Sequence, residues 1–304
     1  MRASPPGRRP LAATAVAVAE ARPRYLTALP THRLPGTAQL VVGAVVLFLL
    51  VAAVALAPAL TSQDPLTTDV AALALRPGAA GHLLGTDTLG RDVLSRMLYG
   101  GRVSIAVGVL AATVSLLLGV LVGALAGASP SRLDAIVMRI VDALLALPLL
   151  VVVVAVQAIT QPSLATVVIA IGLTSWMPVA RVVRAEFLTL RERSYVRAAI
   201  TLGTSPTAVV RRHLIPNALP PVLVVAAFQV AHAVATESTL SFLGLGVPPS
   251  QPSWGNMLNA AQEHVLTGEW WTLVWPGAAI MLTILSVNLI ADGLRLRGDP
   301  RLRG

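Results

Sequence analysis

The chain of 304 residues contains no cysteine and no lysine, so all 23 of its basic residues are arginine. Without cysteine, disulfides, cysteine-ligated zinc and thiol catalysis are excluded, and cysteine usage says nothing of the redox compartment. Without lysine, a phosphate-binding P-loop is excluded, because that loop needs a lysine to reach the β- and γ-phosphates of a nucleotide. If the protein works with ATP, another chain must therefore hold the nucleotide.

Charged and aromatic residues are also scarce, at 12% and 4%, whereas 55% of the residues are hydrophobic. A soluble domain carries about a quarter charged residues, so this composition favours a protein in apolar surroundings. The net charge of +9 would fit a nucleic-acid partner, but the arginines lie in short segments between apolar runs and not in one patch with aromatic residues. The enrichment of arginine in cytoplasmic loops of membrane proteins explains this distribution better, and we expect no nucleic-acid partner.

Six apolar runs are long enough to cross a bilayer, whose hydrocarbon core of about 30 Å needs around 20 helical residues. The sequence predicts spans at residues 38–60, 102–126, 133–158, 164–183, 217–236 and 272–291. The first run also resembles a signal peptide with a loose cleavage site at 57–59, but such signals have shorter leaders and shorter apolar cores. A retained anchor is favoured, and the predicted fold class is an all-α integral membrane protein surrounded by membrane lipid.

Arginine is concentrated in the segment 1–37, in the polar segment after the fourth span and in the tail 295–304, whereas the loop 237–271 has none. By the positive-inside rule, we expect a multi-pass protein of the plasma (inner) membrane with both termini in the cytoplasm. The segment 61–101 balances its arginines with aspartates. We expect it to be extracytoplasmic and to end in a short amphipathic helix near 92–99.

The segment 195–217 reads as two helices separated by a glycine. The first helix is expected to end near Leu202, and Gly203 suits the left-handed position that follows a helix end. Pro206 suits the first turn of a second helix, which we expect Pro216 to stop. A helix–glycine–helix unit at a membrane surface can dock as a rigid knob in a groove of a partner.

This segment resembles the cytoplasmic EAA loop of bacterial ABC importer permeases, whose pattern is Glu-Ala-Ala, three residues, Gly, nine residues, then Ile-x-Leu-Pro. Four residues match at the required spacing: Ala198, Ala199, Gly203 and Pro216. Three residues depart from it, with Arg197, His213 and Ile215 in place of Glu, Ile and Leu. The departure at Arg197 leaves open whether that position makes an ionic contact with an ATPase.

Two further segments narrow the resemblance. Residues 82–104 and 237–258 are similar to the corresponding segments of the second permease of dipeptide and oligopeptide importers, and the tail 299–303 fits as well. The resemblance covers most of the chain from about residue 80 onward and leaves the segment 1–37 unaccounted for.

The resemblance implies a type I permease fold with a core over 102–294, in a bacterial plasma membrane. It implies a non-catalytic chain that pairs with a second, homologous permease as a heterodimer. Two ATP-binding subunits would bind ATP and magnesium, an extracytoplasmic binding protein would deliver peptides, and this chain would hold no cofactor. The loop at about 186–216 would couple ATP hydrolysis to alternating access, through Ala198, Ala199, Gly203, Thr204, Ser205, Arg211, Arg212 and Pro216.

Other solutes and other protein classes remain alternatives. Related importers carry nickel, glutathione or other small solutes. A secondary transporter should show related halves or interrupted helices. A channel needs no docking loop, and a membrane enzyme needs a polar cluster near an interface. The set Glu263, His264 and Glu269 lacks a credible metal-ligand spacing, so we expect no metal site.

Polar and small residues inside the predicted spans have both structural and functional interpretations. Arg139 and Asp142 are three residues apart, so they share a helix face, and mutual pairing is favoured over a place in a substrate path. A packed, hydrogen-bonded His232 is favoured over a path residue. Gly119, Gly123 and Gly127 are expected to serve helix packing. Four tryptophans fit an interfacial belt or a surface for a binding protein: Trp254, Trp270, Trp271 and Trp275. The belt is favoured for the last three.

Overall fold

The computed structural model describes residues 36–128, 132–264 and 267–298, so the segment 1–35 and residues 299–304 lie outside it. The first half of this part contains α2 (Gly36–Ala55), α3 (Ala57–Leu60), the 3-10 turns η1 (Val70–Ala72) and η2 (Ala79–Gly81), α4 (Val93–Ala128), α5 (Arg132–Leu145) and α6 (Leu149–Ile159). The second half contains α7 (Leu164–Arg191), α8 (Ser194–Thr201), α9 (Pro206–Val209), the π-helical turn η3 (Val210–Leu214), α10 (Ile215–Phe242), α11 (Trp254–Ala261) and α12 (Trp271–Gly298). Among the described residues there is no β-strand.

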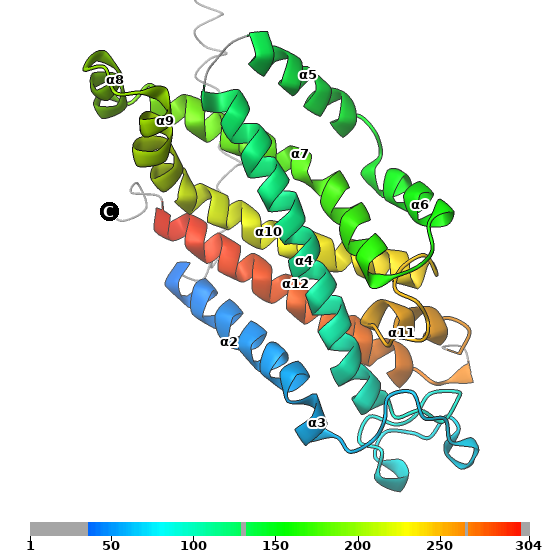
Figure 1. The fold of residues 1–304 in the computed structure, drawn as a ribbon. Coiled ribbons are helices and arrows are strands. Elements are labelled where there is room, and N and C mark those ends of the chain that lie inside the picture. The colour runs from blue at the N-terminus through cyan, green and yellow to red at the C-terminus, as the bar shows by residue number, and fades with distance from the viewer. Residues whose placement is uncertain (1–35, 129–131, 265–266, 299–304) are drawn as a thin grey trace, which may run out of the picture. The chain divides into compact units, whose positions relative to one another are not determined.

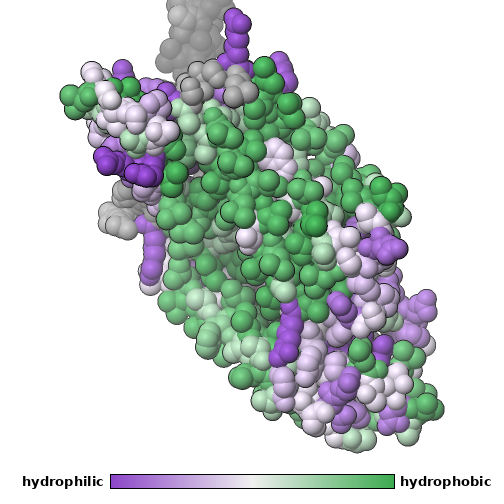
Figure 2. All heavy atoms as spheres, in the orientation of Figure 1, coloured by the Kyte–Doolittle hydropathy of each residue, from purple (hydrophilic) through white to green (hydrophobic). Residues whose placement is uncertain are grey.

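Among the described residues, five helices are long and apolar enough to cross a membrane: α2, α4, α7, α12 and the continuous helix Pro206–Phe242. The pair α5–α6 supplies a sixth if its two halves count as one bent span. Figure 1 places α8 and α9 at one end of the bundle, and the segment 61–92 with α11 at the other. Hydrophobic residues cover the middle of the face seen in Figure 2, and hydrophilic residues gather at both ends. The predicted all-α membrane fold is confirmed.

The third predicted span is not one straight helix. α5 ends at Leu145, α6 begins at Leu149, and the two axes differ by 77°. Pro148 lies in the break as the residue before α6. Proline has no N–H for a helical hydrogen bond and disfavours helical geometry in the residue before it, which explains why the helix breaks here.

The separate amphipathic helix expected near 92–99 does not form, because these residues are the first two turns of α4. Asp92 precedes that helix, and its carboxylate accepts a hydrogen bond of 2.7 Å from the amide of Ser95, as a helix-capping side chain does. At 1.5 Å per residue, α4 is about 54 Å long and exceeds the bilayer core.

The prediction that Pro216 stops a helix is wrong. The backbone runs through η3 into α10 without a loop, and within this turn the amide of Ile215 donates to the carbonyl of Val210. The side chain of Asn217 also donates to the carbonyl of His213, at 2.7 Å. The wider π turn and this side-chain bond let the helix continue past a residue that has no N–H.

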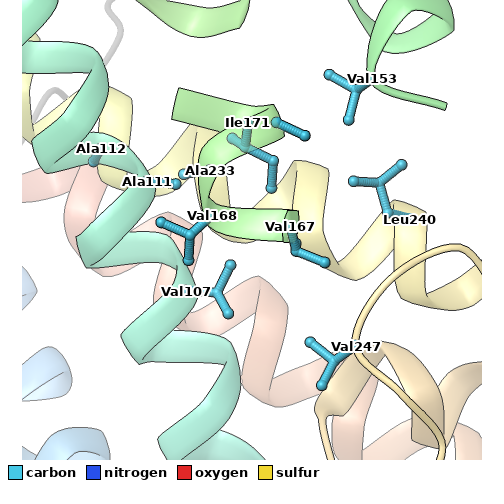
Figure 3. Packing of buried hydrophobic residues seen from close by; sticks show 11 residues of the cluster. Val107, Ala111, Ala112, Val153, Val167, Val168, Ile171, Ala233, Leu240 and Val247 are labelled. Atoms are coloured by element: carbon cyan, nitrogen blue, oxygen red, sulfur yellow. The ribbon is translucent and has the colours of Figure 1, made fainter. Parts of the chain in front are cut away.

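Glycines allow α4 and α7 to approach closely. A side chain added at Gly123 would place its Cβ 2.5 Å from the carbonyl oxygen of Ala180, and one at Gly119 would lie 2.5 Å from Val179. Gly127 meets the side chain of Phe187 in the same way. The predicted packing role of these glycines is confirmed. Next to this contact, α4, α7 and α10 share a core in which valines, alanines and Leu240 point toward one another (Figure 3).

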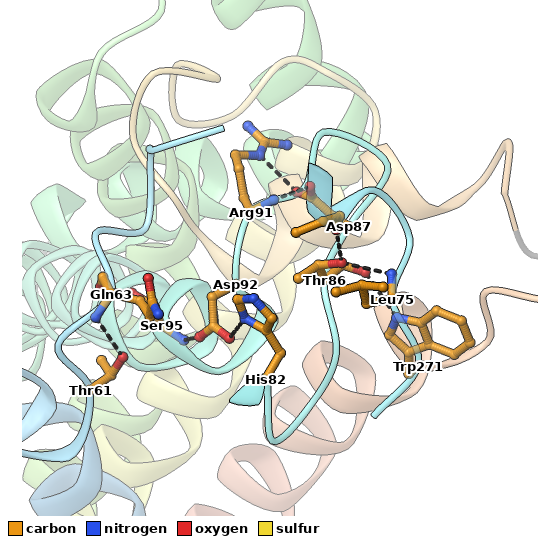
Figure 4. A network of polar contacts seen from close by, with 11 residues as sticks. Thr61, Gln63, Leu75, His82, Thr86, Asp87, Arg91, Asp92, Ser95 and Trp271 are labelled. Atoms are coloured by element: carbon orange, nitrogen blue, oxygen red, sulfur yellow. Dashed lines mark hydrogen bonds and ion pairs between the residues drawn. The ribbon is translucent and has the colours of Figure 1, made fainter. Parts of the chain in front are cut away.

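The segment 61–92 folds over the end of α4 through polar contacts (Figure 4). His82 and Asp92 lie 2.8 Å apart, and Asp87 and Arg91 form an ion pair of 2.7 Å. The indole of Trp271 donates to the carbonyl of Thr86 at 3.0 Å. The hydroxyl of Ser95 on α4 donates to the carbonyl of Gln63 at 2.7 Å, so this segment is tied to both α4 and α12.

Two of the four tryptophans are buried, and each uses its indole N–H inside the protein. Trp254 donates to the carbonyl of Met97 at 2.9 Å, and Trp271 donates as described above. The belt interpretation is therefore wrong for Trp271, and Trp254 offers no surface to a partner. Trp270 is half-exposed, so the belt interpretation stays a prediction there.

The start of the predicted outer loop is still helical, because α10 extends to Phe242 and includes Glu237. Glu237 is 0% exposed, and its carboxylate accepts hydrogen bonds from Ser241 at 2.8 Å and from Ser238 at 3.4 Å. The hydroxyl of Ser241 in turn accepts from the amide of Val247, in the loop that leads to α11. A buried carboxylate thus fixes the end of α10 to the loop that follows it.

Candidate functional site

The predicted break at Gly203 is present, and its hydrogen bonds define it. Gly203 has a φ of +83° and follows Leu202, the C-cap residue of α8. Its amide donates to the carbonyl of Ile200, and the amide of Thr204 donates to the carbonyl of Ala199, both at 3.0 Å. These two bonds form a Schellman motif, in which a left-handed residue closes the end of a helix.

The second half of this unit begins as the sequence predicts. Ser205 is the N-cap of α9, its hydroxyl accepts a hydrogen bond of 3.4 Å from the amide of Ala208, and Pro206 opens the first turn. We call the residues from Ser194 to Leu214 the knob. Both of its short helices have a defined end, so its conformation is set by local hydrogen bonds.

The knob is anchored to the bundle by buried aliphatic side chains. Val196 from α8, Val209 from α9 and Leu214 from η3 form one hydrophobic cluster with Val183 and Phe187 of α7. Each of these five side chains is buried. The knob therefore packs on α7 as a fixed part of the bundle.

The outer side of the knob is exposed and partly apolar. Leu202 is 86% exposed beside the glycine break, and Ile200 and Tyr195 on α8 are exposed as well. The ring of Tyr195 lies 6.0 Å from that of His213. A single exposed leucine is common on protein surfaces, but burial of Leu202 together with Ile200 and Tyr195 against a partner would be favourable.

Arginine surrounds this apolar tip. Arg197, Arg211 and Arg212 are exposed, and Arg197 forms a long surface pair with Glu192, at 3.8 Å with both side chains largely in solvent. Such exposed pairs contribute little to stability. Arg197 is therefore available for another contact at the position where the EAA pattern has an acid.

The structure brings most of the predicted site residues into the knob. Ala198, Ala199, Gly203, Thr204 and Ser205 lie around the break, and Arg211 and Arg212 lie on η3. Pro216 lies outside the knob, in the first turn of α10. Leu202 was missed as a site residue, although an apolar residue directly before a predicted helix-ending glycine was the signal that could have found it.

A second polar group lies between α5 and α7. Asp142 forms an ion pair with Arg181 at 3.9 Å, so the predicted pairing with Arg139 is wrong. One turn along α7, Arg184 makes two hydrogen bonds to the carboxylate of Asp134, at 2.5 and 2.7 Å. Sequence spacing reveals only neighbours on the same helix, and both of these pairs join different helices.

His232 lies on an exposed face of α10, so the expectation of a packed, hydrogen-bonded histidine is wrong for this chain by itself. In the described part of the chain, no group of three or more histidine, aspartate or glutamate side chains is placed to hold a metal ion.

The chain matches the family model described as the binding-protein-dependent transport system inner membrane component, over residues 119–304. It is 41% identical to a putative peptide transport system permease protein of Brucella suis over 263 residues, which are 86% of this chain and 88% of that protein. It is also 41% identical to the dipeptide transport system permease protein DppC of Bacillus subtilis, over 75% of this chain and 71% of that one.

A third relative is the oligopeptide transport system permease protein OppC of Bacillus subtilis, which is 38% identical over 86% of this chain and 85% of its own length. Among solved structures, a crystal structure of an amino acid ABC transporter with histidines matches with a TM-score of 0.52 and 18% identity. That match covers 66% of this chain and 94% of the other, and it bears on the fold alone.

Proposed function

The chain belongs to the family of inner membrane components of binding-protein-dependent transport systems, and from this premise we propose that it is the permease subunit of an ATP-driven importer of peptides. The solute is inferred from relatives that carry peptide, dipeptide and oligopeptide transport in their names and align with most of this chain. The chain itself moves the solute and catalyses no reaction.

The knob is the docking element for an ATP-binding subunit. The observation that carries this role is the combination of a fixed base with an exposed apolar tip: Val196 and Leu214 are buried against α7, whereas Leu202 is 86% exposed. A partner that buries Leu202 can move the knob, and the buried base passes that movement to α7 and α10. Ala198, Ala199, Gly203, Thr204 and Ser205 shape the docking surface, Arg211 and Arg212 border it, and Pro216 lies where it joins α10.

The assembly that follows has a second, homologous permease, two ATP-binding subunits that hold ATP and magnesium, and an extracytoplasmic binding protein. The arginine-rich knob and both termini face the cytoplasm, and the segment 61–92 with α11 faces outward. This orientation is supported by the positive-inside rule, since the loop around α11 contains no arginine. The membrane is the plasma (inner) membrane of a bacterium, which agrees with the description of the family.

The first test is isolation of the tagged chain from its native membrane in mild detergent, with identification of the proteins that accompany it. We expect a second permease and ATP-binding subunits, and ATP hydrolysis that the loaded binding protein stimulates. After reconstitution in vesicles, labelled dipeptide and oligopeptide uptake is measured against uptake of nickel and glutathione. Recovery of the chain without an ATPase would refute the assignment as an ATP-driven importer. Uptake of nickel or glutathione alone would refute dipeptides and oligopeptides as its solutes.

A further inference from the structure

Two ion pairs join α5 to α7, and they differ in how tightly they are made. Asp134 is buried and receives two short hydrogen bonds from Arg184, which is the geometry of a structural pair. Asp142 and Arg181 are 3.9 Å apart, and their side chains are 57% and 59% exposed. The second pair is long, and both of its groups remain accessible to a further partner.

This loose pair lies inside the apolar part of the bundle. At 1.5 Å per helical residue, Asp142 is about 15 Å along α5 from Arg132, and Arg181 is about 15 Å along α7 from Arg191. Around it, Ile136 and Ile140 expose apolar side chains on α5. Charges at such a depth are costly in lipid, and they are found where they face a water-filled cavity or a functional path.

A cleft opens at this pair. It has a volume of about 370 Å³ and is lined by Met138, Asp142, Arg181, Val182, Arg184 and Ala185. That volume lies in the range of about 300–1,000 Å³ that is common for small-molecule sites. The axis of α5 turns away at the break before Pro148, so α6 does not continue along the cleft.

The charges of the cleft match those of a zwitterion. Arg181 carries a planar guanidinium that binds a carboxylate through two parallel hydrogen bonds, and Asp142 accepts hydrogen bonds from an ammonium group. We propose that Asp142 and Arg181 are a docking point for the terminal charges of a peptide in the cytoplasmic half of its path, with the carboxylate on Arg181 and the ammonium on Asp142. This inference rests on the proposed function and adds a solute site within this chain.

The test uses the complete transporter in vesicles, with the binding protein saturated by a labelled dipeptide. The variants are Arg181→Gln and Asp142→Asn. The matched control is Arg139→Gln, which removes a positive charge as Arg181→Gln does, but at a position on α5 that does not line the cleft. We expect each cleft variant to lower peptide uptake per ATP hydrolysed by about tenfold, the effect of losing one charge-assisted hydrogen bond. The control should stay within about twofold of wild type, because it leaves both docking charges in place.

Four results would overturn the inference. Unchanged uptake per ATP in both cleft variants removes the role. Full recovery by the exchange Asp142→Arg with Arg181→Asp makes the pair purely structural. Loss of the second permease on purification makes it a subunit contact. A defect that appears only in vesicles with phosphatidylglycerol, and not in pure phosphatidylcholine, makes it a lipid headgroup site.

A second measurement, the rate of thiol labelling, tests whether the cleft is open to water and to peptide without relying on transport rates. Because this chain has no cysteine, Ala185→Cys places a single thiol in the cleft and Ile140→Cys places one on the apolar surface of α5. A charged, water-soluble thiol reagent should label the first thiol faster than the second, and dipeptide should slow the labelling. Equal labelling of the two thiols, or labelling of Ala185→Cys that dipeptide leaves unchanged, would contradict a wet solute site. Wild-type uptake tests the proposed function, whereas variant-to-wild-type ratios and labelling test this inference.

Discussion

Substitutions at Gly203 test whether the backbone conformation of the knob is needed for coupling, because they remove no side-chain contact. A Cβ added at Gly203 would meet no atom within 4 Å, so the cost of a side chain there comes from the backbone alone, at a φ of +83°. A left-handed conformation costs a residue with a side chain about 1–2 kcal/mol, and a β-branched residue more. A penalty of that size lowers the ratio of the native break to its alternatives by about 5–30-fold. Asparagine adopts this conformation more readily, so Gly203→Asn is the matched control.

We therefore expect the ATP-binding subunits to hydrolyse ATP with poor coupling when they are assembled with Gly203→Val. Uptake per ATP should fall several-fold with Gly203→Val, less with Gly203→Ala, and hardly at all with Gly203→Asn. The assay is labelled-peptide uptake and phosphate release measured in the same vesicles, with the melting temperature of the complex as a check on folding. Wild-type coupling in Gly203→Val would refute the argument, and so would an asparagine variant as damaged as the valine variant.

The other predictions concern contact, packing and a buried acid. Leu202→Ser should reduce recovery of the ATP-binding subunits on purification without lowering the melting temperature of the chain, because this leucine is exposed; an equal fall in both would point to a folding role. Gly123→Val should destabilise the chain by about 1–3 kcal/mol through its clash with Ala180, seen as a lower melting temperature in detergent. Glu237→Ala should cost about 1–3 kcal/mol, because Ser241 loses its buried acceptor, and Glu237→Gln should cost less; equal melting temperatures would contradict this reasoning.

Hydropathy predicts which parts of this chain are long helices, and it fails where geometry depends on hydrogen bonding. The apolar run 133–158 has the length of a span, but its break depends on Pro148, which hydropathy counts only as one more residue. Pro216 gives the opposite error. The helix continues there because a π turn and the side chain of Asn217 supply hydrogen bonds that the sequence pattern does not display.

Some features of the candidate site could be predicted from the sequence, and others depend on contacts that form only in the folded bundle. The glycine break was predictable, because a left-handed helix end has a strong residue preference. The base of the knob was not, since Val196 and Leu214 are ordinary aliphatic residues whose burial depends on α7. The partner of Asp142 was also hidden, because Arg181 reaches it only after the bundle has formed.

The helix that runs from Pro206 to Phe242 has a mechanical consequence. At 1.5 Å per residue it is about 55 Å long, and no loop interrupts it between α9 and Glu237. A flexible linker would absorb a small displacement at one end, whereas a continuous helix acts as a lever and carries it to the other. The π turn η3 lies near the end of this helix that belongs to the knob, and a change in winding there would rotate the rest of the helix. If the knob docks as proposed, movement imposed on one side of the membrane would reach the other side as rotation and tilt of this helix.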